Sequence, residues 1–113
     1  MRIVQELVPG KQITLSHIIA NPDEVLFTKL GLDPKTDYRR SAIGVLTVSP
    51  AESAVIAADI SIKSSGAEIG FVDRFTGTLI ISGSVSSVES AFSAIRDYFT
   101  DKLRYVCCEI TKT

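Results

Sequence analysis

Residues 67–82 read AEIGFVDRFTGTLIIS, two apolar runs on either side of a short polar turn. The runs 67–73 and 78–82 are typical of strands, and Gly77, the last residue of the turn, can adopt the left-handed backbone that such a turn needs. The sequence therefore predicts an antiparallel hairpin with its turn at 74–77.

A strand and a helix precede this hairpin. The apolar run 42–48 predicts the strand, and the following SPAE, residues 49–52, has the order of an N-cap, a proline and a capping-box glutamate. The helix that begins there should end before Gly66. Its predicted buried face consists of Ala51, Ala54, Val55, Ala58 and Ile62.

A second helix follows the hairpin. It is predicted to begin at Ser86, and apolar residues recur along it at helical spacing. These residues are Val88, Phe92, Ile95 and Phe99. A final strand is predicted over 103–110. The block 42–100 thus has the order β-α-β-β-α, a split βαβ arrangement.

The N-terminal part adds a strand over 12–20, with Ile13, Leu15, His17 and Ile19 predicted on one buried face. A short helix follows, which Asn21 can cap and Gly31 can end. Residues 2–8 form a further strand with no obvious partner in the chain. The predicted fold is α+β and ferredoxin-like, an antiparallel sheet with helices packed on it.

The length of 113 residues corresponds to one domain. Within it we distinguish an N-terminal strand and turn (1–10), a strand and short helix (11–32), a charged linking loop (33–41) and a core block with the C-terminal strand (42–113).

Composition excludes several classes of protein. Twelve Lys and Arg balance thirteen Asp and Glu, which argues against nucleic acid as a partner. The apolar runs are too short to span a membrane, and no secretion signal is visible, so a cytoplasmic protein is expected. The chain has one histidine and two adjacent cysteines, Cys107 and Cys108, and no metal, cofactor or catalytic site is expected.

The order of short motifs resembles that of a known family. AIGVLTVSP (42–50), AAD (57–59) with Lys63, EIGFVDRFTG (68–77) and GSV (83–85) resemble the bacterial microcompartment (BMC) shell-protein domain. Upstream, VPGKQ (8–12) leading into 14–22 resembles the circularly permuted members of EutS and PduU type, from ethanolamine and propanediol utilisation. The strand and helix that come last in the usual order here come first.

The resemblance implies a homohexamer that tiles edge to edge with other BMC shell proteins around encapsulated enzymes, in the bacterial cytoplasm. It also implies that the N-terminal strands form a small β-barrel over the six-fold axis. The residues of that strand are Arg2, Ile3, Val4, Gln5, Glu6, Leu7 and Val8.

Three further sites follow from the resemblance. Lys63 matches a lysine at the hexamer edge, where it would meet the neighbouring hexamer. Arg74, Phe75, Thr76 and Gly77 match the loop near the axis, and Phe75, where the family usually has small residues, favours a plugged axis. Ser41 stands where a glycine accompanies bent hexamers in relatives, so a flat hexamer is expected.

Other interpretations remain open at this point. A small-molecule-sensing oligomer of similar topology is the main alternative, and an enzyme lacks a nucleophile–base pair. His17 is expected to be a satisfied structural or interface residue, and Glu68, Asp59 and Asp73 to form salt bridges or hydrogen bonds. The pathway, for which ethanolamine utilisation is favoured over propanediol, the luminal face and a possible docking of targeting peptides are not decided by the sequence.

Overall fold

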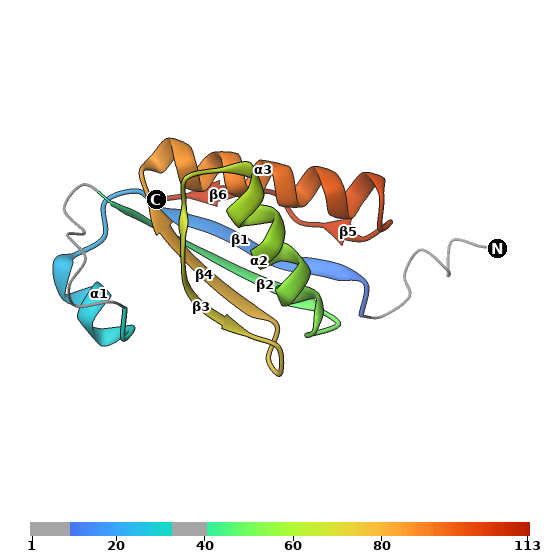
Figure 1. Ribbon diagram of the computed structural model, residues 1–113, viewed down its shortest axis with the longest axis horizontal. Coiled ribbons are helices and arrows are strands. Elements are labelled where there is room, and N and C mark those ends of the chain that lie inside the picture. Colours follow the sequence, from blue (N-terminus) through green and yellow to red (C-terminus); the bar gives the residue numbers. More distant parts are fainter. Residues whose placement is uncertain (1–9, 33–40) are drawn as a thin grey trace.

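The computed structural model of the chain describes residues 10–32 and 41–113, so the predicted strand 2–8 and the loop 33–40 lie outside the described residues. The described parts contain six strands and three helices (Figure 1). The elements are β1 (Gln12–Ile19), α1 (Glu24–Lys29), β2 (Ala42–Ser49), α2 (Ser53–Ser64), β3 (Glu68–Asp73), β4 (Thr78–Gly83), α3 (Val85–Asp101), β5 (Val106–Cys107) and β6 (Thr111–Lys112).

The strands form one sheet in the order β3-β4-β2-β1-β5, and β6 also pairs with β1. Strands β1 to β4 pair antiparallel, as predicted. The pairing of β5 and β6 with β1 is parallel, so the sheet is mixed, with two short parallel pairs added to the predicted antiparallel strands. The parallel pairing follows from the long helix α3, which carries the chain back to the end of the sheet where β1 begins. From there β5 and β6 run beside β1 in the same direction as β1.

The C-terminal strand is also shorter than predicted. In place of one strand over 103–110, the structure has β5 and β6, each of two residues. Arg104 has a positive φ of 63°, which prevents an extended strand from beginning at 103.

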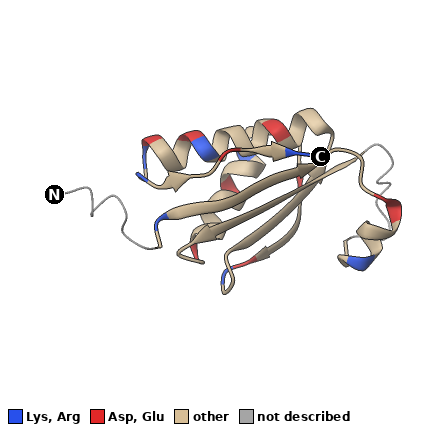
Figure 2. Ribbon diagram, turned by 180° about the vertical axis from the view of Figure 1, so that it is seen from behind, with Lys and Arg blue, Asp and Glu red and all other residues tan. Residues whose placement is uncertain are grey.

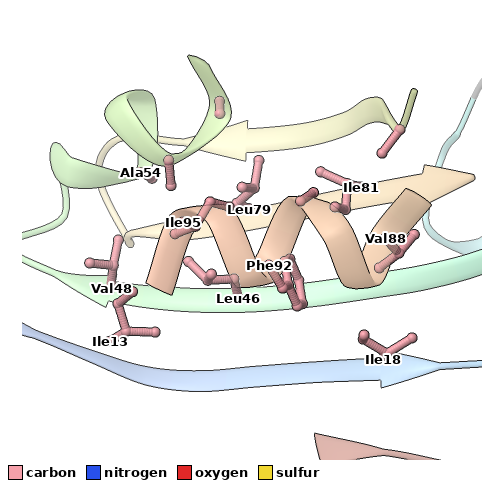
Figure 3. Close-up of a cluster of buried hydrophobic side chains, with 14 of the residues drawn as sticks. Ile13, Ile18, Leu46, Val48, Ala54, Leu79, Ile81, Val88, Phe92 and Ile95 are labelled. Atoms are coloured by element: carbon pink, nitrogen blue, oxygen red, sulfur yellow. The ribbon is translucent and has the colours of Figure 1, made fainter. Parts of the chain in front are cut away.

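Helices α2 and α3 cover one face of the sheet, and the main core lies beneath them (Figures 1 and 3). The predicted stripe on α3 is confirmed, because Val88, Phe92, Ile95 and Phe99 are at most 1% exposed. Figure 3 shows Val88, Phe92 and Ile95 facing Leu46, Leu79 and Ile81 from β2 and β4, and Phe99 belongs to the same cluster. Burial of these apolar side chains contributes most of the free energy that holds α3 on the sheet.

The face that α2 buries differs from the prediction. Ala54, Ala57, Ala58 and Ser61 are buried, whereas Val55 and Ile62 are 53% and 59% exposed. Small residues let α2 approach α3 and the sheet closely, so the bulkier residues are turned outward. The prediction that Val55 and Ile62 are buried was therefore wrong.

The alternation in β1 is interrupted by a bulge between Ile13 and Leu15. The buried positions are Ile13, Ser16 and Ile18, and Leu15 is 40% exposed. A bulge adds one residue to a strand and moves later side chains to the other face. The prediction that Ile13 shares one buried face with Leu15, His17 and Ile19 was therefore wrong.

The helix caps were predicted only in part. Asp23, not Asn21, caps α1 by accepting a hydrogen bond from the Val25 N–H. Ser49 ends β2, and α2 begins without a side-chain cap, so the predicted cap by Ser49 was wrong. Helix α3 begins one residue earlier than predicted, capped by Ser84.

The opposite face of the sheet carries a smaller apolar cluster. Phe27 of α1 and Leu32 pack there on Ile43 of β2. Strands β1, β2 and β4 contain no Lys, Arg, Asp or Glu, and the charges lie mainly on the helices and at strand ends (Figure 2). Over residues 10–32 and 41–113, no helix has the length and apolarity needed to cross a membrane.

Candidate assembly surfaces

The hairpin between β3 and β4 is held by Asp73. Its carboxylate accepts hydrogen bonds from the Phe75 N–H at 2.8 Å and from the Thr76 hydroxyl at 2.9 Å, and its carbonyl accepts one from the Gly77 N–H. The Phe75 N–H, followed by the Thr76 hydroxyl, lowers the pKa of Asp73 below its ordinary value of 3.8. Asp73 thus forms hydrogen bonds, as predicted, and they fix the loop.

This fixed loop presents a large apolar side chain to solvent. Phe75 is 79% exposed, the most exposed of the large apolar side chains in the described residues. The Arg74 guanidinium lies 4.9 Å from the centre of its ring, within the range of a cation–π contact. Phe75 and Arg74 therefore form the tip of the hairpin, and none of the residues that the structure describes buries the phenyl ring.

Gly77 joins this tip to the rest of the sheet. It has a φ of +79°, and its carbonyl accepts a hydrogen bond from the Val48 N–H at 2.8 Å. A Cβ at this position would lie 2.1 Å from the Val48 carbonyl oxygen. Only glycine fits, so the position of the hairpin relative to the end of β2 is rigid.

The chain enters the described fold at the same end of the sheet. Gln12 at the start of β1 pairs with Ser49 at the end of β2, and Gly10 lies beside the Ser49 side chain. Because Gly77 adjoins Val48, the hairpin and the point from which residues 1–9 lead away are close together.

Lys63 lies near the C-terminal end of α2, where the chain turns toward β3 (Figure 1). Its ammonium contacts the Asp59 carboxylate at 2.9 Å, with exposures of 74% and 57% for the two side chains. The hydrogen bond from Lys63 to Asp59, together with their charge attraction, raises the pKa of Lys63. Asp59 thus forms the kind of salt bridge that was predicted, on the surface of the subunit.

Lys63 and the hairpin do not come together in the subunit. Helix α2 begins beside the hairpin, since Ala51 lies close to Gly77, and it runs away from it. Strand β3 then runs from the end of α2 back to the hairpin. Lys63 and the 74–77 tip therefore lie at opposite ends of β3. Ser41, half-buried before β2, is also at the end of the sheet far from the hairpin, because Ala42 pairs with Gly83.

The sequence analysis missed an apolar surface between these two ends. Val55, Ile56 and Ile62 of α2 are 42–59% exposed, and Val72 of the adjoining edge strand β3 is 41% exposed on the same side of the sheet. Phe71, 45% exposed, points to the other face because neighbouring strand residues alternate. The signal that could have revealed it is the spacing of the small residues 54, 57, 58 and 61. This i, i+3, i+4, i+7 set is a complete buried stripe by itself.

The remaining candidate residues have structural partners. Both ring nitrogens of His17 form hydrogen bonds with threonine hydroxyls, to Thr111 and, at 2.9 Å, to Thr113, which confirms a satisfied structural histidine. Cys107 and Cys108 are free thiols that pack partly against the main core. Within the described residues, no three His, Cys, Asp or Glu side chains gather as metal ligands would.

Comparison with known proteins identifies the family. Residues 42–110 match the BMC domain. The shell protein PduU of Salmonella typhimurium strain LT2 is 48% identical over 99% of this chain and 93% of its own length. The shell protein EutS of Escherichia coli strain K12 is 46% identical over 99% of this chain and 96% of its own length.

Solved structures agree with this assignment. The structure "CutR flat hexamer, form 1" is 45% identical and covers both chains completely, with a TM-score of 0.84. A second structure, "CutR dimer with domain swap", is 43% identical over 92% of this chain, with a TM-score of 0.65. The fold and its exposed apolar edge are those of an assembling structural module, and the chain belongs to the BMC-domain shell proteins. These relatives are structural proteins, which agrees with the expectation that the chain is not an enzyme.

Proposed function

We propose that this chain forms a homohexamer that tiles with other BMC shell proteins into the shell of a cytoplasmic microcompartment. The observation that carries the proposal is the similarity of the complete chain to the CutR flat hexamer. The exposed apolar side chains of α2 and β3 support it, because large apolar side chains left in water favour burial against another subunit. The sensing module is set aside because the relatives are shell proteins.

In this proposal the 74–77 hairpin faces the six-fold axis and Lys63 faces the outer edge. Their positions at opposite ends of β3 support the assignment, because a ring subunit needs one end at the axis and the other at the rim. Around the axis one phenyl ring becomes six, so the exposed Phe75 side chains would obstruct a pore.

Residues 2–8 would form a parallel β-barrel with their symmetry copies above this axis. The support is the position of Gly10, beside Ser49 and close to the hairpin, at the end of the sheet where the axis would lie. Closing these strands into a barrel would leave no unpaired strand edge. The barrel and the six Phe75 rings together would plug the axis.

The hexamer is proposed to be flat, with Ser41 restricting the backbone at the bend position. The chain is proposed to be circularly permuted, with 33–41 as the loop that joins the ancestral ends. Ethanolamine utilisation remains the proposed pathway, although PduU and EutS are nearly equal in identity to this chain. A pull-down of ethanolamine- and propanediol-pathway enzymes, with and without residues 1–8, tests the pathway and a docked targeting peptide together.

The first experiment is the absolute mass in solution, by light scattering after size exclusion. Six copies of 12.2 kDa give about 73 kDa, which is the expected result. A monomer or dimer would overturn the hexamer, the barrel and the tiling together.

The variant Lys63→Ala tests the edge assignment separately. It should leave the hexamer mass unchanged and abolish the extended sheets seen by electron microscopy. In this assignment the variant removes a contact between hexamers, and within the subunit it removes only the exposed ion pair with Asp59, which contributes little to stability. Lys102→Ala, a substitution of another exposed lysine, is the matched control and should leave the sheets intact. Sheets that form normally with Lys63→Ala would contradict the assignment.

A further inference from the structure

The C-terminal residues 106–113 lie as a strap along the outer edge of β1. The backbone N–H groups of Val106, Cys108 and Thr113 donate to carbonyls of Lys11, Ile13 and Ile18 at 2.9–3.1 Å. Strands β5 and β6 supply only two residues each to the sheet. Because β1 ends its side of the sheet, nothing else in the described chain pairs with this edge.

Side chains hold the strap at three further points. His17 bonds Thr111 and Thr113, Glu89 of α3 bonds Lys112 at 2.6 Å, and Arg96 of α3 donates to the Cys108 carbonyl at 3.3 Å. Cys107, Cys108 and Ile110 also pack against the main core. A strap that simply detached would expose these apolar side chains to water, so release requires another site of the same kind.

The hinge that leads into the strap is strained. Arg104 has a φ of 63° and is the only described non-glycine residue with a positive φ. An L-residue with a side chain adopts this conformation at a cost, which is relieved when the hinge straightens. When the strap packs on its own subunit, it keeps its contacts while the backbone of Arg104 remains strained.

We propose that residues 106–113 are an exchangeable segment, and that the β1 edge of one subunit can bind the strap of a second copy. The swapped strap makes the same hydrogen bonds and apolar contacts in trans, while the hinge at Arg104 is free to extend. The 43% identical CutR has been solved as a domain-swapped dimer, which shows that this fold permits exchange. The proposal does not depend on the six-fold assembly and assigns the exchanged element and its hinge in this chain.

Two co-expressed chains with different tags test the exchange. Both carry Cys107→Ser and Cys108→Ser; one also carries Gln12→Cys and the other Val106→Cys, two exposed positions that pair in the sheet. A short bis-maleimide should link the two chains covalently in a swapped assembly. One chain with both new cysteines is the control that the reagent spans the pair.

Two hinge variants separate exchange from simple proximity of neighbouring subunits. Arg104→Gly relieves the strain of the closed hinge and should lower the yield of linked chains by about five-fold or more. Arg104→Ala loses the same charge and side chain but keeps the strain, so its yield should equal that of the unmodified hinge. Circular dichroism of each variant checks that it is folded.

The proposal is overturned if no link forms between the two chains, or if Arg104→Gly and Arg104→Ala give equal yields. Light scattering on the same samples reports the oligomer independently. A hexamer mass without interchain links would remove the exchangeable strap and leave the proposed shell function intact.

Discussion

Ser61 carries the one buried side-chain oxygen that has no hydrogen-bond partner among the described residues, on the small face of α2. Ser61→Ala removes a desolvated hydroxyl and adds a better helix former, so we expect stability to rise by about 1 kcal/mol. Urea unfolding at fixed protein concentration measures the change.

Ser53→Ala is the matched control on the same helix. Ser53 is also buried, but its hydroxyl hydrogen-bonds the Tyr105 hydroxyl at 2.5 Å, so its loss should destabilise the protein by about 1 kcal/mol. Equal effects of the two variants would show that the partner of the hydroxyl is irrelevant.

Asp73 makes the stability of the hairpin depend on pH, because its ionised carboxylate accepts the hydrogen bonds of the turn. Its pKa is lowered in the fold, so its contribution to stability is present above 3.8 and is lost as the pH falls through the lower folded pKa. Asp73→Asn keeps an oxygen acceptor but has no charge to lose. The difference in melting temperature between wild type and variant, followed from pH 6 to pH 2, should therefore shrink toward zero below the ordinary pKa. A difference independent of pH would contradict this role.

At the scale of elements, the β3–β4 hairpin depends on Gly77 for two separate reasons. Gly31→Ala introduces a side chain at a φ of +74° into open space, and should cost about 1 kcal/mol from the backbone alone. Gly77→Ala adds to a similar φ a steric clash with the Val48 carbonyl, and should cost roughly 3 kcal/mol or more. Denaturant unfolding of the two variants separates them, and equal costs would show that the clash is relieved by a shift of the hairpin.

Helices α2 and α3 show when the spacing of apolar residues is enough to predict which face of a helix is buried. The α3 stripe was predicted residue by residue, because four large residues at helical spacing have one way to be buried together. On α2 two stripes compete, one small and one bulky, and periodicity alone does not say which faces the sheet. The close approach of α3 decides in favour of the small one.

At the scale of the whole molecule, the exposed apolar side chains on the α2 side, Val55, Ile56, Ile62 and Val72, are expected to be buried between subunits. Ile62→Glu places a charge in that interface, where it would lose water without gaining a partner, so the mass should fall below that of the hexamer. Val25→Glu changes a residue of similar exposure on α1 and should leave the mass unchanged. Light scattering at several protein concentrations distinguishes the two, and a hexamer with Ile62→Glu would show that this surface faces solvent.

The sequence by itself determined the order of elements, the turn at Gly77, the core stripe of α3 and the family. All of these depend on residues within one helix, one hairpin or a series of short motifs, each of which is local in the sequence. Only the tertiary structure decided the bulge in β1, the parallel pairing of β5 and β6, the outward face of α2 and the proximity of Gly10 to the hairpin. These features depend on which distant segments share a limited core, and that competition is settled by packing over the whole chain and not by the pattern of any one segment.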